Sequence, residues 1–225
     1  MVQLTDMKSF EEWLADQQFF PSNPAELDVL KRVYDEMCAN AEASKTEIIK
    51  GRLCDWATQY YVAGRMAACA RLVPVYGNLL HHAVEMYLKT ALVGVVSLKD
   101  LKNKYIHDLE KLWQRFKAKE ADTVLDRFDA TIHALHEFED DLRYPDKIPH
   151  AAILMAITWE PSRAVEQYAG RPTPTYEVFI SDVDRLVIEI LKRVPLNPKF
   201  FSDRVGPSGR EALQYQNPHA ADWLC

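Results

Sequence analysis

Glycine is scarce in this sequence. Only seven of the 225 residues are glycine, whereas average usage near 7% would give about sixteen. Scarce glycine favours long helices over a turn-rich sheet protein. The sequence also contains no glycine-rich phosphate loop and no GxSxG motif. Nucleotide hydrolysis by a P-loop and acyl transfer on an α/β-hydrolase sheet are therefore disfavoured.

Paired cysteines and long apolar runs are also lacking. The four cysteines form no CxxC pair, which predicts free, mostly buried thiols in a reducing compartment rather than a disulfide frame or a zinc knuckle. The best apolar run, residues 91–98, is far below the roughly 20 residues that span a bilayer. Glu11 and Glu12 stand where a signal peptide needs an apolar core. We expect a cytoplasmic protein with no membrane partner.

Charge is distributed unevenly along the chain. The totals are 27 basic and 33 acidic side chains, a net charge of -6, so nothing attracts nucleic acid globally. Residues 99–119 carry seven Lys or Arg against three acids, whereas residues 120–141 carry eight acids against one Arg. We interpret the two stretches as solvated helix faces that attract each other, although the basic stretch also offers a local contact for RNA.

Apolar residues at helical spacing predict an all-α protein, an up-and-down helical bundle. We expect an N-terminal helical extension (1–50), the bundle (51–195) and an irregular C-terminal tail (196–225). A capping box at Ser44 and Glu47 predicts a helix start, and Pro74 with Gly77 predicts a helix end. The predicted helices cover residues 24–41, 44–73, 78–96, 107–119, 122–142 and 176–194, with a short helix at 151–159.

Three polar residues interrupt the apolar helix at 78–96. His82, Glu85 and Lys89 are spaced i, i+3, i+7, which puts them on one face. Charges inside a bundle must be paired or hydrogen-bonded. The pattern therefore indicates one of three arrangements: a Glu85–Lys89 pair at a wet edge, a polar cluster facing a cleft, or a structural salt-bridge network. A second helix carries His136, Glu139 and Arg143, and the two helices would share a polar seam if they pack together.

The histidines alone do not predict a metal site or a cofactor. His133 and His136 point about 60° apart on a helical wheel, and the adjacent residues His81 and His82 diverge by about 100°. We therefore expect no metal ligands and no cofactor.

Four segments occur in a suggestive order: YYVAGR at 60–65, NLLHHAVEMYLK at 78–89, YIHDL at 105–109 and LRYP at 142–145. The order HAxExxLK, HDL, RYP resembles the HEPN superfamily of small helical domains, over roughly residues 53–195. The resemblance implies a four-helix core and a homodimer. It also implies a stress or defence setting, with a nucleotidyltransferase or an antitoxin as partner.

Two functions follow from the resemblance. Arg143 and His150 match the Arg-x(4 to 6)-His spacing of its metal-independent endoribonucleases. In that interpretation both would be catalytic across a dimer interface, with His150 moving a proton and Arg143 stabilising phosphate charge. Pro145 and Pro149 break the helix that would hold the pair. We therefore favour a module that binds a small anionic or nucleotide ligand, or a protein partner. Its expected ligand-binding residues are His82, Glu85, Lys89, His107, Arg143 and Tyr144.

Overall fold

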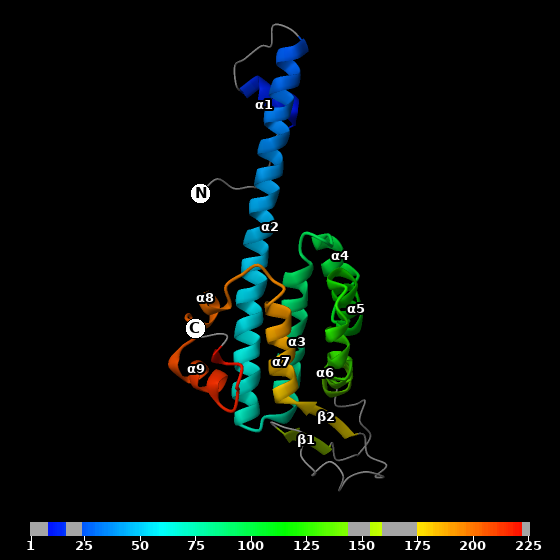
Figure 1. The fold of residues 1–225 in the computed structure, drawn as a ribbon, viewed down its shortest axis with the longest axis vertical. Helices are drawn as coiled ribbons and strands as arrows, with labels where there is room; N and C mark the ends of the chain where they lie inside the picture. Colours follow the sequence, from blue (N-terminus) through cyan, green and yellow to red (C-terminus); the bar gives the residue numbers. More distant parts are fainter. Residues whose placement is uncertain (1–8, 17–23, 144–153, 159–174, 222–225) are drawn as a thin grey trace. The chain divides into compact units, whose positions relative to one another are not determined.

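The computed structural model describes residues 9–16, 24–143, 154–158 and 175–221, and it is almost entirely helical (Figure 1). The all-α prediction is confirmed. The chain divides into two compact units, Met1–Ile49 and Lys50–Cys225. Among the described residues, no helix is both long enough and apolar enough to cross a membrane.

The first unit contains α1 (Phe10–Asp16) and the beginning of α2 (Pro24–Cys69). A capping box starts α1: the Glu12 amide donates to Ser9 Oγ, and the Ser9 amide donates to the Glu12 carboxylate. Phe10 and Trp13 then pack on Tyr34 of α2, with ring centroids 5.4 and 5.5 Å away. Aromatic packing therefore joins the two helices of this unit.

The predicted break near residue 44 is wrong, since α2 is one continuous helix. The Ser44 hydroxyl donates to the carbonyl of Asn40, one turn back, instead of capping a new helix. Apolar side chains in this part of α2 are not all buried, since Trp56, Tyr60 and Met66 are exposed. The face of α2 that packs inward carries Cys54, Ala57, Thr58, Tyr61 and Arg65, so this face includes a buried charge.

The helix at the centre of the second unit is α3 (Val73–Leu92), which begins five residues and ends four residues before the helix predicted at 78–96, and it contacts α5, α6 and α7. Pro74 does not end a helix but lies in the first turn of this one, where a missing N–H costs nothing. α2 packs against α3 at Gly64, where an added Cβ would lie 2.8 Å from Leu80 Cδ2. Glycine is needed there because the two helices approach closely.

Three capped segments follow α3. Side chains of Ser97, Asp108 and Asp122 cap α4 (Leu98–Asn103), α5 (Leu109–Glu120) and the 3₁₀ helix η1 (Thr123–Phe128). α6 (Asp129–Arg143) then packs on α5 and α3. Lys117 of α5 lies 2.9 Å from Asp126 and 2.8 Å from Asp129, so the basic and acidic stretches do attract each other.

Two short strands replace predicted helix. β1 (Leu154–Thr158) pairs in parallel with β2 (Thr175–Phe179), with Leu154 opposite Thr175. The helix expected at 151–159 is therefore wrong over the five residues described there, and the last bundle helix, α7 (Ile180–Leu191), begins four residues later than predicted. Threonine, valine and aromatic residues dominate β2, and these residues favour strand over helix.

The expected irregular C-terminal tail is also wrong. α8 (Pro198–Ser202) and α9 (Pro207–Gln214) form there and lie beside the C-terminal part of α2 (Figure 1). Their prolines occupy first helical positions, where proline favours a helix rather than breaking it. Phe201, Ala212 and Leu213 are buried. The segment is therefore part of the packed unit.

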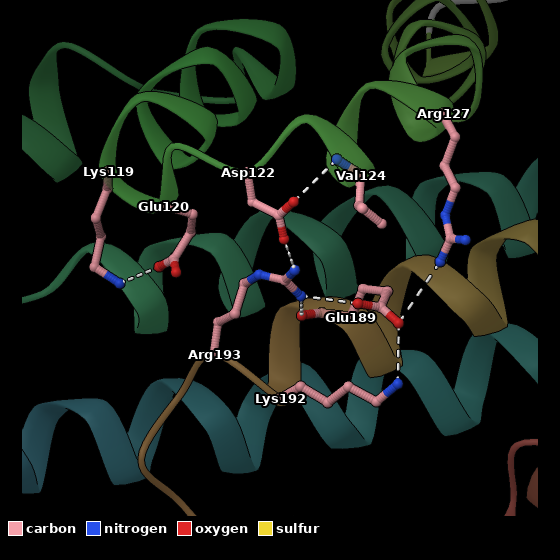
Figure 2. Close-up of polar contacts among 8 residues, drawn as sticks. All are labelled: Lys119, Glu120, Asp122, Val124, Arg127, Glu189, Lys192 and Arg193. Atoms are coloured by element: carbon pink, nitrogen blue, oxygen red, sulfur yellow. Dashed lines mark hydrogen bonds and ion pairs between the residues drawn. The ribbon is translucent and has the colours of Figure 1, made fainter.

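Ion pairs fasten the end of α7 to η1 (Figure 2). Arg193 pairs with Asp122 and with Glu189, and the second of these contacts measures 2.8 Å. Glu189 also forms ion pairs with Lys192, at 3.0 Å, and with Arg127, at 3.6 Å. Three cations thus share one carboxylate, and Asp122 both caps η1 and holds Arg193.

Candidate functional site

A fully buried carboxylate lies in α3. Glu85 has no exposed surface, and its two oxygens face different partners. Lys89, one turn later in α3, donates to Oε1 at 2.5 Å. Two histidine nitrogens approach the other oxygen, Oε2: His107 Nδ1 at 3.2 Å and His82 Nδ1 at 3.4 Å. A third, His81 Nε2, lies 4.0 Å from the same oxygen. We call these five residues, His81, His82, Glu85, Lys89 and His107, the Glu85 cluster.

The local sequence explains how α3 supplies four of the five members. His81 and His82 precede Glu85 by four and three residues, and Lys89 follows it by four, so all lie within one turn of the carboxylate. His107 comes from the turn that precedes α5. Its backbone φ is 51°, in the left-handed region that residues other than glycine rarely adopt. This conformation lets the chain turn into the Asp108 cap with the His107 ring against α3.

The cluster is buried on one side and open on the other. Glu85 and His81 are fully buried, whereas the side chains of Lys89, His82 and His107 are 12%, 26% and 39% exposed. The His82 ring lies 5.5 Å from the His107 ring and 5.5 Å from the ring of Tyr60, which is itself exposed. Solvent therefore reaches two imidazoles and one aromatic face above a buried anion.

Electrostatics keeps Glu85 ionised. Burial alone would raise its pKa, but the hydrogen bonds from His82 and Lys89 and the charges of Lys89 and His107 outweigh burial. The pKa of Glu85 therefore lies well below the ordinary value for a glutamate. A permanent negative charge of this kind orients the donors around it.

The structure brings together four of the residues that the sequence singled out, His82, Glu85, Lys89 and His107. Arg143 is the last residue of α6, and its side chain lies outside the described residues, as do Tyr144 and His150. The expected seam between Arg143 and Glu85 therefore stays a prediction.

His81 was set aside on the sequence because it diverges from His82 on a helical wheel. Both residues nevertheless reach Glu85. His81 precedes it by four positions and His82 by three, so the two side chains flank Glu85 on the helix surface. The His81 Nδ1 atom also bonds the carbonyl oxygen of Leu135 in α6 at 3.0 Å. Testing the i, i+4 spacing from His81 to Glu85 would have found this residue.

A second buried charge was missed entirely. Asp184 of α7 accepts hydrogen bonds from Arg65 Nη1 on both oxygens, at 2.5 Å each, and from the Tyr61 hydroxyl. Arg65 also donates to the backbone carbonyls of Ala212, at 2.9 Å, and Tyr215. Tyr61, Arg65 and Asp184 are fully buried. This network therefore joins α2, α7 and the segment around α9.

His133 and His136 line an open groove of about 890 Å³ between α5 and α6. His133 Nδ1 contacts Glu110 at 2.7 Å on the surface. Lys104, Lys111 and Arg115 share the groove with Asp108, Glu110 and Asp129, so its charges are mixed. The groove therefore favours neither an anionic nor a cationic ligand.

Among the described residues, the only His, Cys, Asp and Glu side chains grouped closely enough to hold a metal are His81, Glu85 and His107. Comparisons with models of protein families, with curated proteins and with solved structures each gave no match.

Proposed function

We propose that this protein is a HEPN-like helical module that binds a small anionic ligand, such as the phosphate group of a nucleotide, at the Glu85 cluster. One observation carries the proposal: His107 meets the His82, Glu85 and Lys89 set of α3 although 22 residues separate it from Glu85. The members of the HAxExxLK and HDL motifs thus share one carboxylate. The residues that the motifs single out in the sequence are thus the residues that meet in space, and this agreement supports a binding site.

The orientation of the imidazoles supports anion binding. The Nδ1 atoms of His82 and His107 face the Glu85 carboxylate, which can only accept hydrogen bonds. Each ring therefore carries hydrogen at Nδ1 and leaves Nε2 for another partner. A protonated ring donates from Nε2, and charge-assisted bonds of that kind are the ones that hold phosphate oxygens. Lys89 adds a fixed positive charge nearby, and the Tyr60 ring offers a face on which a base could stack.

The charges of the cluster suit a small anion. Glu85 and Lys89 carry opposite charges, so the pair presents no net negative charge to a phosphate group. The partly exposed rings of His82 and His107 lie on the open side of the cluster, where they can donate hydrogen bonds to that group.

The setting we propose follows the resemblance: a cytoplasmic homodimer in a stress or defence system, with a nucleotidyltransferase or antitoxin as protein partner. Nothing in the binding chemistry requires a metal or an enzymatic step. The proposed site is therefore testable on the purified protein alone.

The test is calorimetric titration with ATP, and separately with pyrophosphate, in buffer that contains EDTA at pH 6.5. We expect measurable binding that His107→Ala and Lys89→Met each weaken by about tenfold or more, the loss of one charge-assisted hydrogen bond. His133→Ala is the matched control, because His133 also contacts a carboxylate but lies outside the cluster. Absence of heat with both probes, or equal affinity in all four proteins, would overturn the proposal.

The second candidate, a metal-independent endoribonuclease, rests on the spacing of Arg143 and His150. Incubation with structured RNA in EDTA tests it. Cleavage that both Arg143→Ala and His150→Ala abolish would support the nuclease over the binding module, whereas intact RNA would reject the nuclease.

A further inference from the structure

The inner side of the Glu85 cluster has the chemistry of a metal site. The Nδ1 atom of His81 lies 3.0 Å from the Leu135 carbonyl oxygen, which can only accept, so Nδ1 carries the hydrogen. In the neutral ring the lone pair is then on Nε2, the atom that faces Glu85. Histidines that bind metals typically use this arrangement, with the second nitrogen donating to a backbone carbonyl.

The distances suit a small divalent ion. Glu85 Oε2 lies 3.2 Å from His107 Nδ1 and 4.0 Å from His81 Nε2, and all three ligand atoms lie within 4.8 Å of one another. A tetrahedral zinc ion with bonds near 2.0–2.1 Å separates neighbouring ligand atoms by about 3.3 Å. Side-chain shifts of less than about 1 Å would therefore close the set around an ion.

We propose that His81 Nε2, Glu85 Oε2 and His107 Nδ1 form a binding site for a divalent transition metal, of which zinc fits the donor set best. The ion replaces the hydrogen that His107 Nδ1 donates to Glu85 in the metal-free protein, and the neutral His107 ring then carries its hydrogen at Nε2. Imidazole and carboxylate ligands suit Zn²⁺, and three protein ligands leave one coordination position for water or another small ligand. The metal site goes beyond the anion-binding function, since it needs no phosphate ligand.

The left-handed backbone of His107 is consistent with this role. A residue other than glycine in that region costs about 1 kcal/mol or more, and such residues cluster at functional sites. The conformation brings the partly exposed His107 ring to a buried carboxylate that already has Lys89. Lys89 already balances the charge of Glu85, so charge balance alone does not explain why His107 lies there. A role as a metal ligand does.

Lys89 gives the proposal its sharpest test. Its ammonium group lies 2.5 Å from Glu85 Oε1, so it competes electrostatically with a cation at Oε2. Replacing it with methionine removes the competing charge and keeps the aliphatic stem. Lys89→Met should therefore strengthen metal binding, whereas the same variant should weaken anion binding in EDTA. The two proposals thus predict opposite effects from one substitution.

The experiment is titration of the apo full-length protein with Co²⁺, followed by visible absorption, and competition with Zn²⁺ followed by calorimetry. We expect one ion per chain with a tetrahedral cobalt spectrum. Loss of an outer-shell partner typically costs 10–100-fold in metal affinity, so His107→Ala, which removes a ligand, should cost at least about tenfold. Glu85→Gln should cost at least as much. His133→Ala, which removes a surface histidine next to Glu110, should change nothing.

Because His107 is partly exposed, His107→Ala keeps the test informative if the buried variants misfold, and circular dichroism checks its fold. Cobalt uptake that His107→Ala leaves unchanged, an octahedral spectrum, or no stoichiometric uptake would overturn the metal site. Lys89→Met binding Zn²⁺ more weakly than the natural protein would overturn it too. None of these results bears on anion binding, which is measured in EDTA.

Discussion

The buried pair of Arg65 and Asp184 gives the strongest prediction for stability. In Asp184→Ala, the Arg65 guanidinium keeps its charge and its place in the core but loses both bonds from Nη1. Tyr61 loses the acceptor for its hydroxyl hydrogen in the same step. Only the carbonyls of Ala212 and Tyr215 still accept from Arg65 among the contacts described above.

The magnitude follows from burial. Removing one partner of a fully buried ion pair strands the other charge, which costs about 3–5 kcal/mol. For a protein of this size, 1 kcal/mol corresponds to roughly 2–4 °C, so we expect Asp184→Ala to lower Tm by about 6–20 °C. Urea denaturation followed by circular dichroism measures the change in the free energy of unfolding.

The matched control lies on the same helix. Asp182 pairs with Arg185 at 3.7 Å in contact with solvent, and exposed pairs contribute about 0–1 kcal/mol. Asp182→Ala should therefore destabilise the protein by less than about 1 kcal/mol. If Asp184→Ala and Asp182→Ala cost the same, the reasoning about the buried pair is refuted.

A local measurement separates the two roles of Arg65. Arg65→Met also removes the donors to Ala212 and Tyr215, whereas Asp184→Ala leaves them. Amide hydrogen exchange in α9 should therefore be faster in Arg65→Met than in Asp184→Ala. Equal exchange rates would mean that Arg65 does not anchor the C-terminal segment.

Two further predictions concern α2 and α3. Gly64→Ala puts a Cβ 2.8 Å from Leu80 and should destabilise the protein by about 1–3 kcal/mol. Gly51→Ala, with nothing within 4 Å of its Cβ, should stabilise the protein by about 0.5–1 kcal/mol. Thermal melts of both variants check these opposite signs. The pKa of Glu85 is lowered in the folded state, so its stabilising effect is present above the ordinary carboxyl pKa of 4.5 and is lost as the pH falls toward the lowered value. The difference in unfolding free energy between the natural protein and Glu85→Gln should therefore shrink between pH 5 and pH 3, and a constant difference would contradict the assignment.

The periodicity of apolar residues predicted the features that depend on neighbours in the sequence, above all the helices. The apolar sequence at 78–96 correctly indicated a central helix, because a helix with apolar residues all round has to be buried. Proline and serine were poor predictors of helix ends, since the same residue starts a helix, breaks it or lies inside it according to its position. Pro198 and Pro207 begin helices, and Ser44 bonds to a carbonyl inside one.

Local sequence patterns could not predict which side chains pair across long stretches of the chain. The spacing of His82, Glu85 and Lys89 marked the cluster because all three lie on one helix. Arg65 and Asp184, by contrast, are separated by 119 residues, and each has an unremarkable neighbourhood in the sequence. The exposed Trp56 shows the same limit: its apolar character alone favours a core position, but the packing of α3 selects the neighbouring face with Ala57 and Tyr61.

Two carboxylates, Glu85 and Asp184, are fully buried in the part of the chain that the structure describes, and their surroundings differ. The Arg65 and Tyr61 side chains that bond to Asp184 are fully buried, so the effect of this pair is on stability. Glu85 has partners that are partly exposed, and one of them, His107, comes from a turn with unfavourable backbone geometry. A carboxylate needed only for stability would be satisfied by Lys89 and His82 on its own helix. The extra histidine from a second segment supports the binding site that we propose.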